Sequence, residues 1–363
     1  MEGGEGGALT LACGRVVNGD GGISAEQAWV SMAHGRVVAT GAGAGPAPPD
    51  ALDLGDALLA PGFVDLQVNG WGDVDFATAG VDEITGAIDE LVAGGTTALL
   101  PTLCTAPLAT YDATLARLND VRAARPGVVL GVHLEGPFLG GAPGAHPPDL
   151  LCPADETFLR HVCDTFGDLV RVVTLASEAD PDGAATRLLA ERGVVVALGH
   201  STVDFDGALA AADAGARMVT HLFNGMGPMH HRAPGLAGAA LHDRRLVPSL
   251  IADFVHVHPA MVKLAVDARP DAVLVTDAVP AAATRLADGT LAGSTLTMDA
   301  AVRNVASLGV PVARAVRHAT ANAARVLGLY DRGRIVPGAR ADLVALDPHD
   351  LTVRGVWVGG RPV

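Results

Sequence analysis

From residue 61 onward the chain repeats one pattern: a short apolar run, a polar turn, and a longer alanine-rich stretch. Short apolar runs bounded by turn residues favour buried strands, whereas the longer stretches favour helices. Strands that alternate with helices form parallel sheets, because each helix carries the chain back to the start of the next strand. This alternation constrains the fold more than any other feature of the sequence.

The alternation can be divided into eight strand–helix units over about 265 residues, which is the size of a (β/α)8 TIM barrel. A doubly wound sheet is the competing arrangement, but no G-x-G-x-x-G sequence follows the first strand. The strands are predicted at residues 63–68, 97–103, 128–134, 170–175, 194–198, 218–220, 247–252 and 272–276. Helices are predicted at residues 82–93, 106–124, 182–192, 206–214, 259–268 and 312–327.

The two ends of the chain have a different pattern. Short β-type runs separated by turn residues fill the first sixty positions and return at residues 342–346 and 351–358. A closed barrel has no free edge for further strands, so we expect the two ends to pair with each other. The sequence therefore predicts a small β-sandwich domain of residues 1–60 plus 330–363, and an α/β barrel domain of residues 61–329.

Composition limits the possible partners. Apolar residues make up 49% of the chain and charged residues 18%, so a large core is expected rather than disorder. The net charge of −15 argues against nucleic acid and anionic membranes as partners, and no apolar run approaches the ~20 residues of a membrane span. The four cysteines show no C-x-x-C spacing that would indicate a disulfide framework or a zinc ribbon. We expect a cytoplasmic protein.

Ionisable residues follow four of the predicted strands: Glu135, His200, His221 and Asp277. In a (β/α)8 barrel these strand ends meet at one mouth, where active sites lie. A single histidine or glutamate at such a position is more often a packing residue than a ligand, as we expect for His133. Four together favour a site.

One carboxylate and two imidazoles are the protein ligands of a catalytic zinc-type centre, with a position left for water. Such a metal lowers the pKa of its water to about 7. Asp277 is then available to carry a proton.

Several longer segments, in the same order, resemble the amidohydrolase superfamily and, within it, the family of N-acetylglucosamine-6-phosphate deacetylases. The resemblance covers nearly the whole chain. The matching segments are P-G-F-V-D-L-Q-V-N-G (61–70), H-L-E-G-P-F (133–138), G-H-S (199–201), H-L-F-N-G-M (221–226), R-A-P-G-L (232–236), I-A-D-F-V-H (251–256), V-T-D-A (275–278), L-A-G-S (291–294) and G-R-I-V-P-G-A-R-A-D-L (333–343).

This resemblance implies one divalent metal ion per chain, held by Glu135, His200 and His221, with Asp277 as general base and then acid. It also implies a histidine near the acetamide, here His146 after Ala145. The phosphate would be bound by Asn224, the backbone at Gly225, Arg232 and His256. The remaining implied pocket residues are Asp253, Leu291, Ala292 and Gly293.

One departure from the wider superfamily concerns the metal. Many amidohydrolases have His-x-His at the end of the first strand for a second metal, but here Gln67 and Asn69 occupy these positions. Amides bind divalent metals poorly compared with imidazole. We therefore expect a single metal, with both amides supporting the ligands or facing the substrate. Zn²⁺ is favoured, and Fe²⁺ or another divalent ion is also compatible with the ligands. The glycine-rich loop of residues 139–145 lacks a basic residue commonly found there.

The expected reaction is hydrolysis of N-acetyl-D-glucosamine 6-phosphate to D-glucosamine 6-phosphate and acetate, in amino-sugar catabolism. In relatives a neighbouring subunit completes the phosphate pocket, so the resemblance implies a homodimer. Three alternatives stay open: another N-acetylhexosamine phosphate such as N-acetylgalactosamine 6-phosphate, a cyclic amide or deaminase substrate, and a non-catalytic scaffold.

Overall fold

A computed structural model of the protein describes residues 8–24, 26–43 and 47–363; the remaining positions of the predicted sandwich domain lie outside the described residues. The chain forms two compact units. One comprises Met1–Asp65, Asp89–Ala98 and Thr297–Val363, and the other Leu66–Ile88 and Leu99–Leu296. The first unit extends beyond the predicted residues 1–60 plus 330–363, because it includes the helices that follow Thr297. The domain limits at residues 60 and 330 stay a prediction.

The barrel prediction is confirmed. Eight strands form one sheet in the order β16-β15-β14-β13-β12-β11-β10-β7. The sheet closes where the end of β7 meets the residues after β16: Val68 pairs with Ala278, and the Asp277 amide donates to the Gln67 carbonyl at 2.9 Å. The strands are β7 (Phe63–Val68), β10 (Thr96–Leu103), β11 (Val132–Glu135), β12 (Val170–Leu175), β13 (Val195–Leu198), β14 (Met218–Val219), β15 (Val247–Ile251) and β16 (Val273–Val275).

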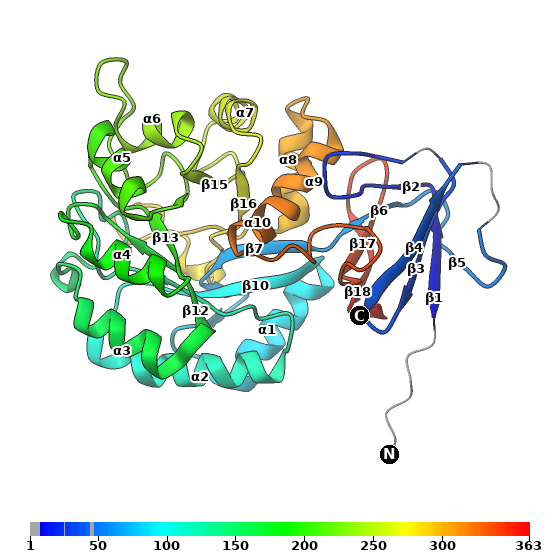
Figure 1. The fold of residues 1–363 in the computed structure, drawn as a ribbon, viewed down its shortest axis with the longest axis horizontal. Helices are drawn as coiled ribbons and strands as arrows, with labels where there is room; N and C mark the ends of the chain where they lie inside the picture. Colours follow the sequence, from blue (N-terminus) through cyan, green and yellow to red (C-terminus); the bar gives the residue numbers. More distant parts are fainter. Residues whose placement is uncertain (1–7, 25, 44–46) are drawn as a thin grey trace. The chain divides into compact units, whose positions relative to one another are not determined.

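Helices alternate with these strands, and α2 to α7 lie outside them (Figure 1). Their ends follow local rules: Asp155 caps the amides of Thr157 and Phe158 at the start of α3, and α5 ends at Gly215. None of the helices in the described part of the chain has the length and apolar character of a membrane span. The helices are α1 (Val81–Ala93), α2 (Tyr111–Ala124), α3 (Glu156–Phe166), α4 (Ala184–Glu191), α5 (Phe205–Ala214), α6 (Gly235–His242), α7 (Pro259–Ala268), α8 (Met298–Ser307), α9 (Val312–His318) and α10 (Ala321–Val326).

The two chain ends form a small sandwich, as predicted. One sheet has the order β4-β3-β1-β5 and the other β19-β18-β17-β6-β2. The C-terminal segment joins the N-terminal one where Val344 of β17 pairs with Ala60 of β6, and Leu11, Val30 and Trp357 belong to one buried core. The strands are β1 (Leu9–Cys13), β2 (Arg15–Val16), β3 (Ala28–Ala33), β4 (Arg36–Ala42), β5 (Leu52–Asp53), β6 (Leu58–Pro61), β17 (Leu343–Leu346), β18 (Val353–Val358) and β19 (Arg361–Pro362).

A polar layer crosses the barrel interior below the strand ends. His133 on β11 contacts the Leu66 carbonyl through Nδ1 at 3.0 Å and the Thr174 hydroxyl through Nε2 at 2.8 Å. Thr174 in turn lies 2.7 Å from the Thr220 hydroxyl. Burial lowers the pKa of His133 to about 4, so the imidazole is neutral near pH 7. These hydrogen bonds connect β11, which carries Glu135, through Thr174 on β12 to Thr220, the residue before His221.

Arg269, directly after α7, is fully buried. Its Nη1 group donates to the carbonyls of Ala240, Asp243 and Leu246, the last two at 2.9 and 2.7 Å. Its Nε and Nη2 groups donate to the Asp271 carboxylate at 2.9 and 2.7 Å. One guanidinium therefore contacts a carbonyl in the last turn of α6 and two in the segment between α6 and β15, and it neutralises a neighbouring carboxylate.

We expect Arg269→Met to lower the free energy of unfolding by about 3–5 kcal/mol, because several carbonyls lose their donor and the partly buried Asp271 carboxylate keeps only the longer contact of 3.7 Å with Arg244. Urea unfolding followed by circular dichroism measures the change. Arg245→Ala is the control, since Arg245 forms exposed ion pairs with Asp213 and Asp243 that contribute about 1 kcal/mol or less. Equal losses in the two variants would contradict this role for Arg269.

Candidate active site and metal centre

A cavity of about 470 Å³ is lined by residues at the carboxyl ends of the barrel strands and in the loops that follow. Most of the site residues predicted from the sequence face this one cavity. Those lining it are Asn69, Glu135, Ala145, His146, His200, His221, Asn224, Gly225, His256, Asp277, Leu291, Ala292 and Gly293.

Three of the predicted residues have an unusual backbone conformation. His200 follows β13 with φ 49°, His221 lies just after β14 with φ 30°, and Asp277 lies just after β16 with φ 49°. Residues other than glycine adopt positive φ at a cost, and such residues cluster where function requires a particular side-chain direction. Each strand thus ends in a turn that directs an ionisable side chain into the cavity.

The side chains of Glu135, His200 and His221 meet in a triangle. Glu135 Oε1 lies 3.1 Å from His200 Nε2 and 2.9 Å from His221 Nε2, and the two Nε2 atoms are 3.1 Å apart. All three residues are buried. His200 Nδ1 donates to the Ala142 carbonyl at 3.1 Å, which orients the ring so that Nε2 faces the other two atoms.

The electrostatics of this triangle call for a positive charge. Burial disfavours the charged form of Glu135, yet the hydrogen bonds from His200 and His221 hold the pKa of the carboxyl well below its usual range. Burial likewise opposes the charge of His221, but the hydrogen bond and charge of Glu135 raise the pKa of the imidazole to about 9. A proton on His221 therefore supplies the positive charge in this arrangement.

A divalent ion fits the same place. Donor atoms held about 2.0–2.2 Å from one tetrahedral ion lie roughly 3.4 Å apart. The triangle has edges of 2.9–3.1 Å, so it needs to open by only a few tenths of an ångström. Two imidazoles and one carboxylate are also a zinc-type ligand set with room for a water. The three residues suit a metal ion.

Asp277 is held beside this triangle by the two amides at the end of β7. Gln67 Nε2 donates to Asp277 Oδ1 at 3.1 Å and to Glu135 Oε1 at 3.1 Å, and Asn69 Nδ2 donates to Asp277 Oδ1 at 2.8 Å. The amides thus orient both carboxylates. Burial, and then the charge of Glu135, raise the pKa of Asp277 to about 7, which suits a residue that takes up and releases a proton.

His146 lies beside Glu135 and also packs edge-on against His200, with the two ring centroids 4.4 Å apart. Its Nδ1 is 2.8 Å from the Thr105 hydroxyl, and its Nε2 is 3.9 Å from Glu135 Oε2. Burial lowers the pKa of His146 to about 4, so the ring is neutral near pH 7 and can present a donor or an acceptor at Nε2.

The residues predicted to bind phosphate separate into two groups. Asn224, Gly225 and His256 line the cavity, and Asp253 fixes His256 through a contact of 2.7 Å between Oδ2 and Nδ1. A Cβ at Gly225 would lie 2.7 Å from His200 Nδ1, so only glycine fits there. Arg232 is not among the lining residues; it is exposed, and its Nη1 contacts His231 at 2.8 Å.

Two neighbouring residues were not singled out from the sequence. Cys104 and Thr105 follow β10 at the same mouth; Cys104 lines the cavity and Thr105 holds His146. Both directly follow a predicted strand, so the rule that residues at strand ends face the barrel mouth applies to them as well. Ala283, Leu286 and Thr290 also line the cavity, but they lie in a loop whose sequence has no comparable signal.

The chain is similar to known proteins in sequence and in fold. Residues 58–363 match the amidohydrolase family. The chain is 38% identical to N-acetylglucosamine-6-phosphate deacetylase of Bos taurus, over 86% of this chain and 84% of that protein. It is also 38% identical to N-acetylgalactosamine-6-phosphate deacetylase of Escherichia coli O157:H7, over 93% of this chain and 96% of that protein.

Among solved structures, a mutant N-acetyl-D-glucosamine-6-phosphate deacetylase from Mycobacterium smegmatis, in complex with N-acetyl-D-glucosamine-6-phosphate, has a TM-score of 0.92 and 38% identity. The match covers 98% of this chain and 99% of that one. The chain therefore belongs to the amidohydrolase family. Within it, the relatives place the chain with the deacetylases of N-acetylhexosamine 6-phosphates.

We expect Glu135→Gln to reduce bound metal from about one ion per chain to less than about a tenth, because it removes the charge that a divalent ion needs. Elemental analysis of purified protein measures the content. His161→Ala is the control, since His161 lies on the surface of α3 and pairs with Asp112. A Glu135→Gln protein with its full metal content would show that the ion binds elsewhere.

Proposed function

We propose that the protein hydrolyses the acetamide of N-acetyl-D-glucosamine 6-phosphate, giving D-glucosamine 6-phosphate and acetate. The observation that carries this proposal is the convergence of Glu135, His200, His221 and Asp277 in one cavity. The deacetylase relatives, which match nearly the whole chain, support it. Such a reaction belongs to the cytoplasmic recycling of amino sugars, where we place the protein.

One divalent ion per chain would be held by Glu135, His200 and His221. A bound ion of this kind lowers the pKa of water and polarises a carbonyl oxygen. Zn²⁺ suits two imidazoles and a carboxylate, and Fe²⁺ is compatible with the same ligands. Gln67 donates to Glu135, so it fixes one ligand.

Asp277 would move the proton. Two amide donors hold its Oδ1 atom, so we assign the proton to Oδ2. The carboxylate takes a proton from the attacking water and then gives it to the amine nitrogen as the C–N bond breaks. His146, with Nδ1 held by Thr105, would donate from Nε2 to the acetyl oxygen.

The phosphate would lie at the opposite end of the cavity, against Asn224, the Gly225 backbone and His256, with Leu291, Ala292 and Gly293 as a wall. Arg232 does not line the cavity of its own chain. We propose that it reaches the phosphate of a partner subunit in a homodimer. A guanidinium binds phosphate through two parallel hydrogen bonds, which also explains how a chain of net charge −15 accepts an anion.

N-acetylgalactosamine 6-phosphate is the second candidate substrate, because a deacetylase of that sugar is among the relatives at 38% identity. The two sugars differ only in the orientation of one hydroxyl group. The ratio of kcat/KM for the two phosphorylated sugars decides between them.

We expect rapid acetate release from the phosphorylated sugar and a kcat/KM lower by about 10²-fold or more for the unphosphorylated sugar, since the phosphate donors are then unused. Asp277→Asn should lower kcat by about 10²–10⁴-fold while retaining metal. Asp112→Asn, on the surface of α2, is the control. Near-normal turnover by metal-containing Asp277→Asn protein would overturn the role of Asp277.

Mixed dimers test the position of Arg232. We expect Asp277→Asn and Arg232→Ala each to have little activity, and their mixture, after subunit exchange, to recover about a quarter of the wild-type rate. Recovery follows because one site of each mixed dimer has both an intact Asp277 and an intact arginine from the other chain. No recovery despite exchange would place Arg232 in the site of its own chain, or outside the site.

A further inference from the structure

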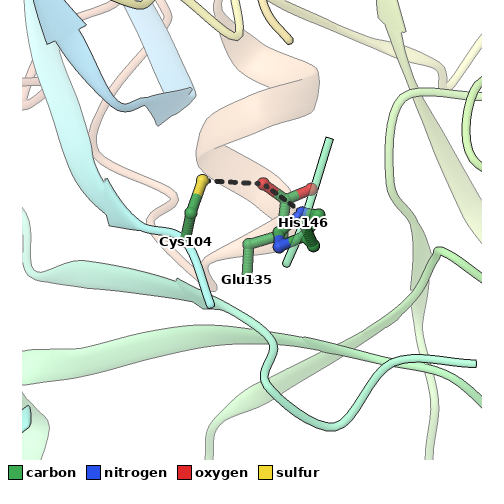
Figure 2. A group of neighbouring side chains, drawn as sticks. All are labelled: Cys104, Glu135 and His146. Carbon is green, nitrogen blue, oxygen red and sulfur yellow. Dashed lines mark hydrogen bonds and ion pairs between the residues drawn. The ribbon is translucent and has the colours of Figure 1, made fainter. Parts of the chain in front are cut away.

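A second cluster of metal-binding atoms shares Glu135 with the first. The Sγ atom of Cys104, a carboxylate oxygen of Glu135 and a ring nitrogen of His146 lie within 4.8 Å of one another (Figure 2). The proposed function gives Cys104 no role. Its Sγ lies 3.8 Å from Glu135 Oε2 and 3.2 Å from Asn69 Oδ1, and His146 Nε2 lies 3.9 Å from Glu135 Oε2.

We propose that Cys104, Glu135 and His146 form a second site, for a thiophilic divalent ion such as Zn²⁺ or Cd²⁺, and that occupation of this site inhibits the enzyme. Binding by these three residues does not depend on the proposed function, whereas inhibition rests on it.

The distances fit such an ion. A tetrahedral zinc ion about 2.3 Å from sulfur and about 2.1 Å from oxygen or nitrogen places these atoms roughly 3.4–3.6 Å apart. The observed separations of 3.8 and 3.9 Å are a few tenths of an ångström longer. Asn69 Oδ1 is an additional oxygen within reach of the same ion, because it already accepts from the Cys104 thiol.

The two clusters use different oxygens of one carboxylate. Glu135 Oε1 faces His200 and His221 at 3.1 and 2.9 Å, whereas Oε2 faces Cys104 and His146. Occupation of one cluster therefore leaves the other oxygen available. Carboxylates bridge pairs of ions in this way in two-metal sites, where the ions are about 3.5–4 Å apart.

Binding a metal at Nε2 changes the tautomer of His146. The Thr105 backbone amide donates to Nδ1 at 3.4 Å, so the ring proton lies on Nε2 when no ion is bound. When an ion takes the Nε2 lone pair, the proton moves to Nδ1, where the Thr105 hydroxyl 2.8 Å away accepts it. The thiol of Cys104 loses its proton to solvent when the ion binds, and a thiolate selects soft ions over Mg²⁺ or Ca²⁺.

An ion at this position prevents catalysis for a simple reason. Catalysis requires His146 to donate from Nε2 to the acetyl oxygen, and the metal occupies that same nitrogen. The ion also lies in the cavity where the acetamide must enter. Inhibition should therefore be competitive with the sugar phosphate.

The binding test titrates Cd²⁺ into the protein as purified, with its resident metal, and follows the ultraviolet charge-transfer band of a cadmium thiolate. We expect one further Cd²⁺ per chain, with the resident metal retained, as measured by elemental analysis. Cys104→Ser should abolish the band, and Cys152→Ser, which changes another free cysteine, should retain it. His146→Gln keeps the thiol and should weaken Cd²⁺ binding by at least about tenfold, since even outer partners of metal ligands contribute roughly 10–100-fold.

The inhibition test measures acetate release at increasing Cd²⁺, each variant relative to its own rate without Cd²⁺. We expect the inhibition constant to rise at least about tenfold in Cys104→Ser and to be unchanged in Cys152→Ser. A thiolate band that persists in Cys104→Ser, or Cd²⁺ that only replaces the resident metal, would overturn the second site. A protein without deacetylase activity that still shows the Cys104-dependent band would refute the proposed function and leave this binding site intact.

Discussion

Glu135 places a carboxylate, 2% exposed, at the end of a barrel strand, where water cannot solvate its charge. An isolated buried carboxylate costs several kcal/mol even after relaxation, so its surroundings must supply donors or a cation. Gln67 donates to Oε1, and two imidazoles converge on the same atom. His133, on the same strand as Glu135, is hydrogen-bonded to Thr174, and Thr174 is hydrogen-bonded to Thr220. These bonds connect β11 to its neighbours inside the barrel. The site depends on this one charge, because the triangle of Glu135, His200 and His221 forms around it and because, after burial, it is the next cause of the raised pKa of Asp277.

The backbone conformation also determines the geometry of the site. His200, His221 and Asp277 each adopt positive φ directly after a strand, which directs all three into the cavity at a local conformational cost. The barrel can bear this cost because its closed sheet fixes where each strand ends. Gly225 completes the arrangement, since a Cβ there would contact the His200 ring at 2.7 Å.

Much of this could be predicted from the sequence, because it follows from strand ends. Alternating apolar runs locate the strands, and the residues after them must face one mouth, which is how Glu135, His200, His221 and Asp277 were identified. Loops follow no such rule: the sequence does not show that Arg232 is absent from the cavity lining, or that the rim includes Leu286. α6, whose sequence is largely glycine and alanine, carries little amphipathic signal and was not identified as a helix. Cys104 also follows a predicted strand, but a single cysteine there, unlike a carboxylate or an imidazole, does not by itself indicate a site.

X-ray diffraction from crystals of the metal-loaded protein, recorded on both sides of the absorption edge of that metal, tests the central claim most directly. The account predicts an anomalous peak about 2.0–2.2 Å from Glu135 Oε1 and from the Nε2 atoms of His200 and His221. An ion bound elsewhere, with these three side chains still hydrogen-bonded to one another, would contradict it.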